Sequence, residues 1–332
     1  MLFYRDLEDC VFGRHELFDV DELIVLSGYV GFEPIERLKE LPFSSTVIYG
    51  MYGEQGIANN LHNVLMKLDK NQNNTSILYS KVPIHSKCYL WKLRNKTVTA
   101  LVGSANFSVN GLRTDYREIL AEMTKDGFNE LDRYIEYIKK ESISCLSPDV
   151  VIGKGKEKGK GNNAPTESSI IVPNVENMSL LDRSGNVPQG SGLNWGFANA
   201  HVKPGDAYIK ITAKNIENHP EMFPPKKMYS FDYLNGKGGK KNRQNDAVEF
   251  LWDDGTTMTV LFEGENKING VSYPKQISSS PNKNVLGYYI RDRLGVARNE
   301  FITVDHLKEY GRTSIRLTKI AEGLYEADFS KP

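Results

Sequence analysis

The sequence has few cysteines, no net charge and no long apolar run. Its three cysteines lie far apart and are odd in number, so they provide neither a disulfide framework nor the spacing of a metal site. Reduced thiols of this kind are typical of a cytoplasmic protein. Without a long apolar run or a signal peptide, we expect neither secretion nor a membrane span. Because 42 basic residues balance 42 acidic ones, any polyanionic partner has to meet a local basic face.

The first 145 residues alternate between apolar runs of strand length and amphipathic segments of helix length. In the segment 56–70, for example, Ile57, Leu61 and Leu65 fall on one helical stripe. Alternating strands and helices favour a sheet that is covered by helices. We therefore predict an α/β domain over residues 1–145, a mixed sheet with flanking helices, with strands at 22–31, 46–53, 76–82 and 117–123 and helices at 33–41, 56–70 and 128–140.

Two changes of composition follow this domain. Residues 146–191 are rich in glycine, lysine and small polar residues, and they bury too little apolar surface to offset the entropy of ordering. We therefore predict a flexible linker there. Residues 192–332 contain several short strand-like runs separated by turn residues, with helical segments at 286–295 and 302–311. This pattern predicts a second, mainly β domain with a barrel-like arrangement.

A group of polar residues brackets a predicted hairpin in the first domain. His85 and Lys87 precede the hairpin, and Ser104 and Asn106 follow it. Because side chains alternate faces on an extended strand, His85 and Lys87 should project together. The hairpin should bring Ser104 and Asn106 back to them. Gly103, which has no Cβ, should leave room for a ligand. Such a set of side chains handles phosphate groups and needs no metal.

The pattern HxK…GSxN resembles the phospholipase D superfamily. The resemblance implies that His85 attacks a phosphodiester, that Lys87 and Asn106 hold its non-bridging oxygens, and that Ser104 is an auxiliary donor. It also implies that Glu118 orients the histidine, because an imidazole attacks through one nitrogen when the other is held as a donor. Two alternatives stay open at this point. A strand histidine is often a satisfied core residue, and Glu118 can belong to a surface ion pair.

The C-terminal half carries a second resemblance. GLNWG at 192–196, the AYIKI strand, FPP at 223–225 and LGYYIRDRLGV at 286–296 are similar to the C-terminal part of NgoFVII-type restriction endonucleases, a B3-like pseudobarrel. The resemblance implies that two loops, 192–206 and 263–273, grip the major groove of double-stranded DNA. Polar side chains such as Asn and Lys read base edges there. The candidate DNA-binding residues are Asn194, Asn199, His201, Lys203, Asn266, Lys267 and Asn269.

The complete HxK…GSxN pattern occurs once, although His201 and Lys203 repeat its first part. Phosphodiester cleavage of this kind uses two histidines, one that attacks phosphorus and one that protonates the leaving oxygen. A chain with one copy of the pattern obtains the second histidine from a second, identical subunit that is related to it by a two-fold axis. We therefore predict a homodimer with one shared active site. A second half-site at His201 is the alternative.

With these resemblances, the sequence predicts a cytoplasmic type II restriction endonuclease. It would cleave DNA through a covalent phosphohistidine, with no metal and no cofactor. Relatives of this type sometimes act with a separate helicase-like ATPase, which is therefore a candidate partner. The first alternative is a lipid hydrolase or general phosphodiesterase of the phospholipase D type, although lipid hydrolysis has no evident need of the second domain. The second is a non-catalytic DNA-binding protein, which the complete set of His, Lys and Asn disfavours.

Overall fold

The computed structural model describes residues 1–53, 56–153, 175–226 and 245–332. The chain divides into two compact units, Met1–Val172 and Pro173–Pro332, and each has its own hydrophobic core. Much of the predicted linker, residues 154–174, lies outside the described residues. Each unit is considered by itself below.

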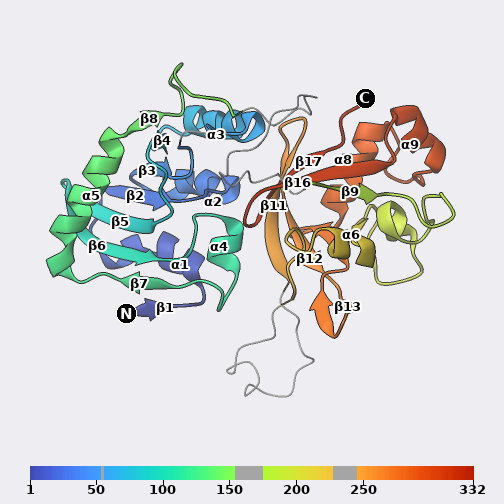
Figure 1. The fold of residues 1–332 in the computed structure, drawn as a ribbon, viewed down its shortest axis with the longest axis horizontal. Coiled ribbons are helices and arrows are strands. Elements are labelled where there is room, and N and C mark those ends of the chain that lie inside the picture. The colour runs from blue at the N-terminus through green and yellow to red at the C-terminus, as the bar shows by residue number, and fades with distance from the viewer. Residues whose placement is uncertain (54–55, 154–174, 227–244) are drawn as a thin grey trace, which may run out of the picture. The chain divides into compact units, whose positions relative to one another are not determined.

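The first unit is a mixed eight-stranded sheet with flanking helices (Figure 1), as the alternating pattern predicts. Strands β2, β3 and β4 run parallel, and their neighbours on both sides are antiparallel. In sheet order the strands are β1 (Leu2–Phe3), β7 (Leu120–Glu122), β6 (Lys96–Gly103), β5 (Lys87–Leu93), β2 (Glu22–Ser27), β3 (Ser44–Tyr49), β4 (Thr75–Ser80) and β8 (Ser142–Ser144). The helices are α1 (Leu7–Phe12), α2 (Phe32–Arg37), α3 (Asn59–Asn71), α4 (Val109–Arg113) and α5 (Phe128–Lys140), with 3-10 turns η1 (Arg14–Leu17), η2 (Leu38–Glu40) and η3 (Lys125–Gly127).

Local sequence explains the central hairpin of this sheet. Arg94 and Asn95 join β5 to β6 with φ angles of 49° and 63°. Two consecutive residues with positive φ match the right-handed twist of the flanking strands, which is why such turns close hairpins. The two strands then pair from Lys87 with Gly103 to Leu93 with Lys96. The hairpin that brackets the candidate site therefore forms as predicted.

The second unit is built on a nearly closed, barrel-like sheet of seven strands, which confirms the predicted mainly β domain. In sheet order these are β10 (Ile209–Lys210), β15 (Gln276–Ser279), β12 (Thr257–Glu263), β11 (Asp246–Trp252), β17 (Leu324–Asp328), β16 (Ser314–Ala321) and β9 (Val175–Ser179). Strands β13 (Asn266–Ile268) and β14 (Val271–Tyr273) form a separate hairpin. The helical elements are η4 (Gly192–Phe197), α6 (Ala213–Asn218), α8 (Asn284–Leu294) and α9 (Val304–Tyr310).

The two units extend into the range predicted as a linker. Strand β9 pairs with β16 at the edge of the second sheet, and Met178 and Leu180 are buried in the core of that unit. At the other end, Ile152 forms a bridge with Ile57 of the first unit. Composition did not reveal these contacts, because a few apolar residues in a polar segment acquire partners only through long-range pairing.

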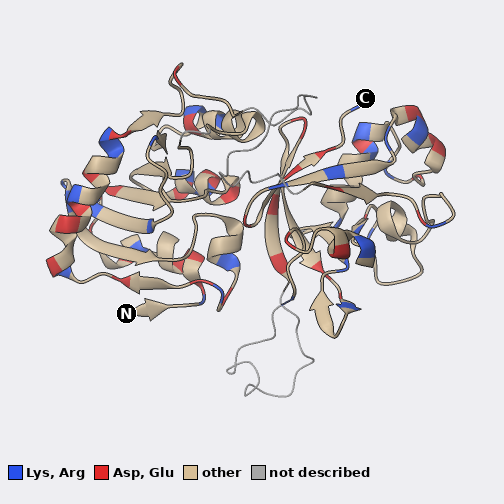
Figure 2. Ribbon diagram, viewed as in Figure 1, with Lys and Arg blue, Asp and Glu red and all other residues tan. Residues whose placement is uncertain are grey.

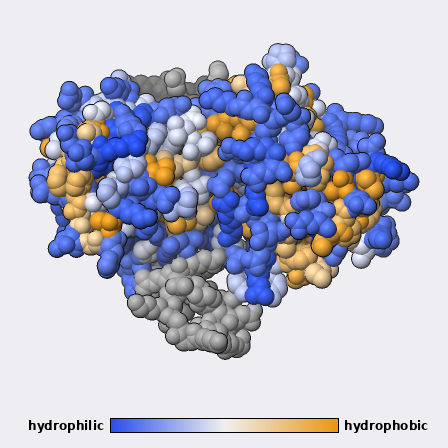
Figure 3. Space-filling model, turned by 180° about the vertical axis from the view of Figure 1, so that it is seen from behind, coloured by the Kyte–Doolittle hydropathy of each residue, from blue (hydrophilic) through white to orange (hydrophobic). Residues whose placement is uncertain are grey.

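Charged and apolar residues are mixed over the surface. Figure 2 shows basic and acidic residues interspersed on both units, in keeping with equal numbers of the two kinds. On the face seen in Figure 3, hydrophobic patches lie between hydrophilic residues. In the part of the chain that the structure describes, no helix is long and apolar enough to cross a membrane.

Candidate active site

Four strands of the first unit bring the candidate residues together where these strands begin or end, on one side of the sheet. Ser27 of β2 pairs with Lys87 of β5. Lys87 in turn pairs with Gly103 of β6, and Gly103 pairs with Leu120 of β7. Strands β2 and β6 end at these paired residues, and β5 and β7 begin there. Residues 85, 104–106 and 118 therefore lie just beyond the same ends of the strands. Strand pairing thus gathers residues that are distant in the sequence.

His85 and Lys87 project together, as the alternation of faces predicts. Nζ of Lys87 lies 3.0 Å from Nδ1 of His85 and also donates to the His85 carbonyl. His85 is exposed, whereas only 4% of Lys87 is exposed. Burial lowers the pKa of the Lys87 ammonium, and the negative charge of Glu118 opposes that effect. The site combines an accessible imidazole with a shielded cation directly beside it.

Two glycine-containing loops pack against the backbone of Ile84 and His85. A Cβ at Gly28 would lie 3.2 Å from Cα of His85, and a Cβ at Gly50 would lie 2.4 Å from the Ile84 carbonyl oxygen. Backbones approach this closely because glycine has no side chain. The ring of Tyr29 meets the imidazole edge-on, with centroids 6.0 Å apart. The loop of Gly28 was not predicted. Its signal is the segment SGYVG, which stands at the end of a predicted strand.

Asn106 is oriented by the loop that follows β2. The backbone N–H of Tyr29 donates to Oδ1 of Asn106 at 3.2 Å. Oγ of Ser27 lies 3.4 Å from the same oxygen and accepts from the N–H of Phe107 at 3.0 Å. With Oδ1 used as an acceptor, the amide presents Nδ2, which is purely a donor. A donor here suits the predicted contact with a phosphate oxygen. Ser27 and Tyr29 are further residues that the sequence analysis missed.

Ser104 and Gly103 contact the neighbouring strand segment. Oγ of Ser104 accepts from the N–H of Ile119 at 3.1 Å, and a hydroxyl used this way keeps its own proton for donation. A Cβ at Gly103 would lie 2.0 Å from the Ile119 carbonyl oxygen. The prediction that Gly103 leaves room for a ligand is therefore wrong, because the backbone before β7 occupies that space.

Glu118 acts on Lys87 in this structure. The carboxylate is half-buried, and its charge favours the protonated form of the lysine. Nδ1 of His85 meanwhile contacts Lys87. The charge of Glu118 therefore acts on the same lysine that contacts His85. The direct orientation of the imidazole by Glu118 stays a prediction.

In the second unit, Asn194 is structural and not the predicted DNA contact. The residue is 0% exposed. Its Nδ2 donates to the carbonyls of Pro188 and Ile302 at 3.1 and 2.8 Å. Its Oδ1 accepts from the N–H of Ile302 at 2.9 Å and from the guanidinium of Arg291 at 3.2 Å. Both ends of the amide are thus fully used, and neither is left for a base edge.

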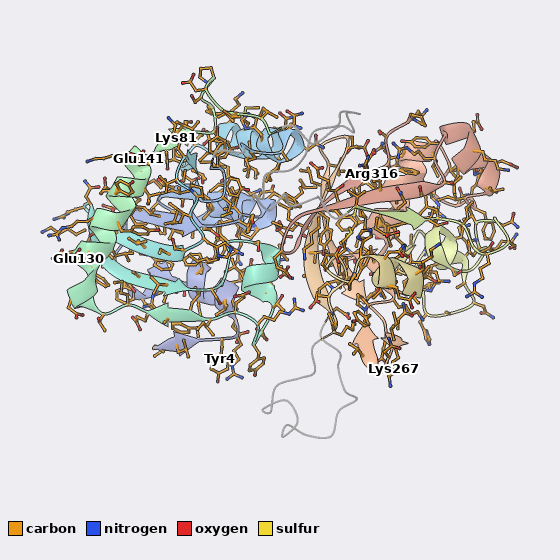
Figure 4. All side chains as sticks on the ribbon, viewed as in Figure 1. Tyr4, Lys81, Glu130, Glu141, Lys267 and Arg316 are labelled. Carbon is orange, nitrogen blue, oxygen red and sulfur yellow. The ribbon has the colours of Figure 1, made fainter. Side chains whose placement is uncertain are left out.

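The other predicted DNA-binding residues lie on two accessible segments. Asn199, His201 and Lys203 are exposed between η4 and β10. The second segment is the hairpin β13–β14, whose turn is Asn269-Gly270 with φ angles of 49° and 79°. Lys267 and Asn269 are exposed there, and Figure 4 shows Lys267 at the outer end of the hairpin. Asn266 is half-buried and donates to the Ile211 carbonyl at 3.0 Å, so this residue also positions the hairpin.

The second HxK does not reproduce the geometry of the first. His201 and Lys203 lie in a loop and not on a strand, so the alternation of faces does not bring their side chains together. The backbone N–H of Lys203 donates to the Asp206 carboxylate at 2.8 Å, which shapes the loop as a turn. This arrangement gives no support to a catalytic half-site at His201.

Two family models match the chain. One describes the NgoFVII restriction endonuclease N-terminal PLD domain and matches residues 5–151. The other describes the NgoFVII C-terminal B3-like DNA-binding domain and matches residues 170–321. The chain belongs to the NgoFVII restriction endonuclease family. Its first unit contains the phospholipase D (PLD) domain and its second the B3-like domain, so both resemblances seen in the sequence are confirmed.

A solved structure also resembles part of this NgoFVII-family chain. NucT from Helicobacter pylori is 16% identical in sequence with a TM-score of 0.33, and the match covers 43% of this chain and 97% of NucT. No curated protein gives a significant match. The family assignment comes from the two domain models.

Proposed function

We propose that this NgoFVII-family chain is a cytoplasmic type II restriction endonuclease that cleaves DNA through a covalent phosphohistidine and needs no metal. One observation carries the proposal. An exposed imidazole, that of His85, lies 3.0 Å from the buried Lys87 ammonium in a PLD domain that is followed by a B3-like DNA-binding domain. A nucleophile beside a fixed cation suits an anionic phosphodiester. In this proposal the second domain binds double-stranded DNA and selects the sequence at which cleavage takes place.

In this proposal the reaction has two steps. One ring nitrogen of His85 attacks phosphorus, an N–P bond forms, and the bond from phosphorus to the leaving oxygen breaks. A second imidazolium gives that oxygen its proton. In the second step this second imidazole, now neutral, takes a proton from water. The water oxygen then attacks phosphorus, and the N–P bond to His85 breaks. One strand is cut and His85 is regenerated.

Lys87 and Asn106 would bind the non-bridging oxygens during both steps. Before DNA arrives, Lys87 contacts Nδ1 of His85. A phosphate oxygen is the better acceptor for the lysine, because it carries negative charge and the imidazole nitrogen does not. An incoming phosphate would therefore draw Lys87 away from the ring and release a lone pair for the attack. The negative charge of Glu118 favours the protonated form of the lysine, and we assign to Glu118 the orientation of the freed ring.

We infer that the second imidazole is His85 of a second copy of the chain. The PLD domain carries one complete HxK…GSxN pattern, and the loop that contains His201 does not reproduce its geometry. A two-fold axis through the site would supply the missing histidine in the equivalent position. The active enzyme would then be a homodimer with a single shared site that cuts the two strands in turn.

Mixing of subunits tests the shared site. Sedimentation should report a dimer of about 75 kDa, twice the 37.5 kDa of the chain. After subunit exchange in a one-to-one mixture of wild type and His85→Ala, activity should fall to roughly a quarter of that of undiluted wild type, because random pairing leaves that share of wild-type homodimers. Each heterodimer would have only one of the two His85 side chains that the shared site needs, and it would be inactive. An activity of roughly one half, or an active monomer, would contradict the shared site.

Chelation separates the proposed enzyme from the alternatives. We expect purified protein to cut a plasmid into discrete fragments in excess EDTA, because Lys87 provides the positive charge that a metal ion provides in other nucleases. In the described residues, no group of three His, Cys, Asp or Glu could hold a metal ion. If EDTA stops cleavage and Mg²⁺ restores it, the histidine mechanism is wrong. Nonspecific degradation, or hydrolysis of phosphatidylcholine vesicles, would favour the general phosphodiesterase. DNA binding without cleavage would favour a non-catalytic protein.

A further inference from the structure

Helix α8 of the B3-like domain contains a buried guanidinium. Arg291 is 0% exposed, and burial lowers its pKa. Within the described residues its acceptors are neutral oxygens, the carbonyls of Leu193, Gly287 and Glu300 and Oδ1 of Asn194, at 3.2 to 3.3 Å. Burying a charge without an opposite charge is unfavourable unless it is hydrogen-bonded. A neutral side chain would fill the same space at a lower desolvation cost, so the position calls for another explanation.

The contacts of Arg291 hold the first end of the loop 192–206. Leu193 and Asn194 belong to η4, which opens this loop. Through Asn194 the same network reaches the backbone of Pro188 and Ile302. One guanidinium therefore ties α8 to the start of the loop.

The same helix holds the other end of the loop. A Cβ at Gly287 would lie 1.9 Å from the Gly205 carbonyl oxygen, so helix and loop are in direct backbone contact. The hydroxyl of Tyr288 donates to the Pro204 carbonyl at 2.9 Å. Contacts from a single turn of α8 thus restrain both ends of the loop. Between them lie exposed candidate DNA-binding residues, including Asn199 and Lys203.

We propose that Arg291 is a positioning residue for sequence recognition, because it fixes the loop 192–206 in the shape in which its middle part meets base edges. The inference rests on the proposed function, in which this loop contacts DNA. Discrimination between bases depends on side chains held within a fraction of an ångström, and a loop that is ordered before binding loses less entropy when it binds. Arg291 would act through the loop and would not itself touch DNA.

Arg293, on the same helix, provides a matched control. Its guanidinium binds the Asp253 carboxylate at 2.7 Å, the hydroxyl of Tyr310 at 2.9 Å and the Phe329 carbonyl at 3.0 Å. These partners lie outside the loop 192–206. Arg293→Met should therefore destabilise the domain at least as much as Arg291→Met, since it breaks a partly buried ion pair. It should leave the sequence preference unchanged.

The test uses the full-length chain and a plasmid library with a short randomised insert, and the ends produced by cleavage are sequenced. For wild type, the ends define a recognition sequence. For Arg291→Met, we expect cutting at single-mismatch sites to rise by about tenfold relative to the cognate site, the discrimination that one good base contact provides. Arg293→Met should keep the wild-type ratio. Arg291→Lys, which retains the charge, should fall between them and replaces Arg291→Met if that variant does not fold.

The outcomes separate this inference from the proposed function. Random ends or no cleavage with wild type would refute the proposed function. A sequence-specific wild type together with an unchanged ratio in folded Arg291→Met and Arg291→Lys would overturn the role of Arg291. Equal relaxation in the Arg291 and Arg293 variants would also overturn it, because the effect would then reflect general stability.

Discussion

The His85→Ala protein is expected to lose all detectable cleavage while it still binds its DNA site. Enzymes accelerate such reactions by at least ~10^6-fold, so loss of the nucleophile leaves nothing measurable. The exposed imidazole lies outside the core, and the B3-like domain has a core of its own, so folding and binding should survive. Plasmid cleavage and a gel-shift assay with the same DNA measure the two properties separately.

His201→Ala provides the control for this prediction. It removes the histidine of the other HxK pair, which lies on the loop 192–206 of the second unit. We expect this variant to cut DNA, with an altered preference among sites at most. Cleavage by His85→Ala near the wild-type rate would show that His85 is not the nucleophile. Loss of cleavage in His201→Ala, with binding intact, would identify His201 as the missing second histidine.

Asn106→Asp should reduce the rate of cleavage by about 10^3-fold. The substitution is nearly isosteric, and the new carboxylate can still accept the N–H of Tyr29 that Oδ1 accepts in wild type. The change falls on Nδ2, where a donor becomes a negative oxygen that faces the phosphate. Removal of one donor from an oxyanion site costs about 10²–10³ in rate, and repulsion of the phosphate adds to this loss. Single-turnover cleavage of a duplex with saturating enzyme measures the effect on the chemical step.

Asn73→Asp adds the same charge away from the site. Asn73 is exposed just before β4, at the end of the parallel strands opposite to the one where His85 lies. Its substitution should leave the rate within about twofold of wild type, since surface charges at long range are screened by salt. If both variants cleave equally well, the amide of Asn106 does not contact the phosphate. If both are slow, net charge and not the position of the amide controls the rate.

Much of this protein follows from short-range patterns. The 3.6-residue period predicted a helix at 128–140, and α5 spans Phe128–Lys140. The period of two on a strand predicted that His85 and Lys87 project together, and their side chains are in contact. A polar turn between two β-rich runs predicted the hairpin that returns the chain to the site. These predictions succeed because steric and hydrogen-bonding preferences within a few residues suffice to produce them.

Other features depend on partners that are distant in the sequence. Asn194, a polar residue in a loop, is indistinguishable by pattern from Asn199, yet the first is buried against Arg291 and the second is exposed. Gly103 permits close approach, as a glycine should, but the approaching group is the backbone of Ile119. In both cases the residue type indicated which interactions are available, and the fold selected the partner.

The sequence by itself therefore determined the fold class and the order of the two domains, and it predicted His85, Lys87 and Asn106 for the candidate active site, because periodicity and motif spacing are local properties. Only the tertiary structure decided that β9 forms an edge strand of the second sheet, that Gly28 and Gly50 allow close backbone contacts beside His85, and that Asn194 is structural. Burial and hydrogen-bond partners arise when segments far apart in the chain pack together. No short stretch of sequence contains that information.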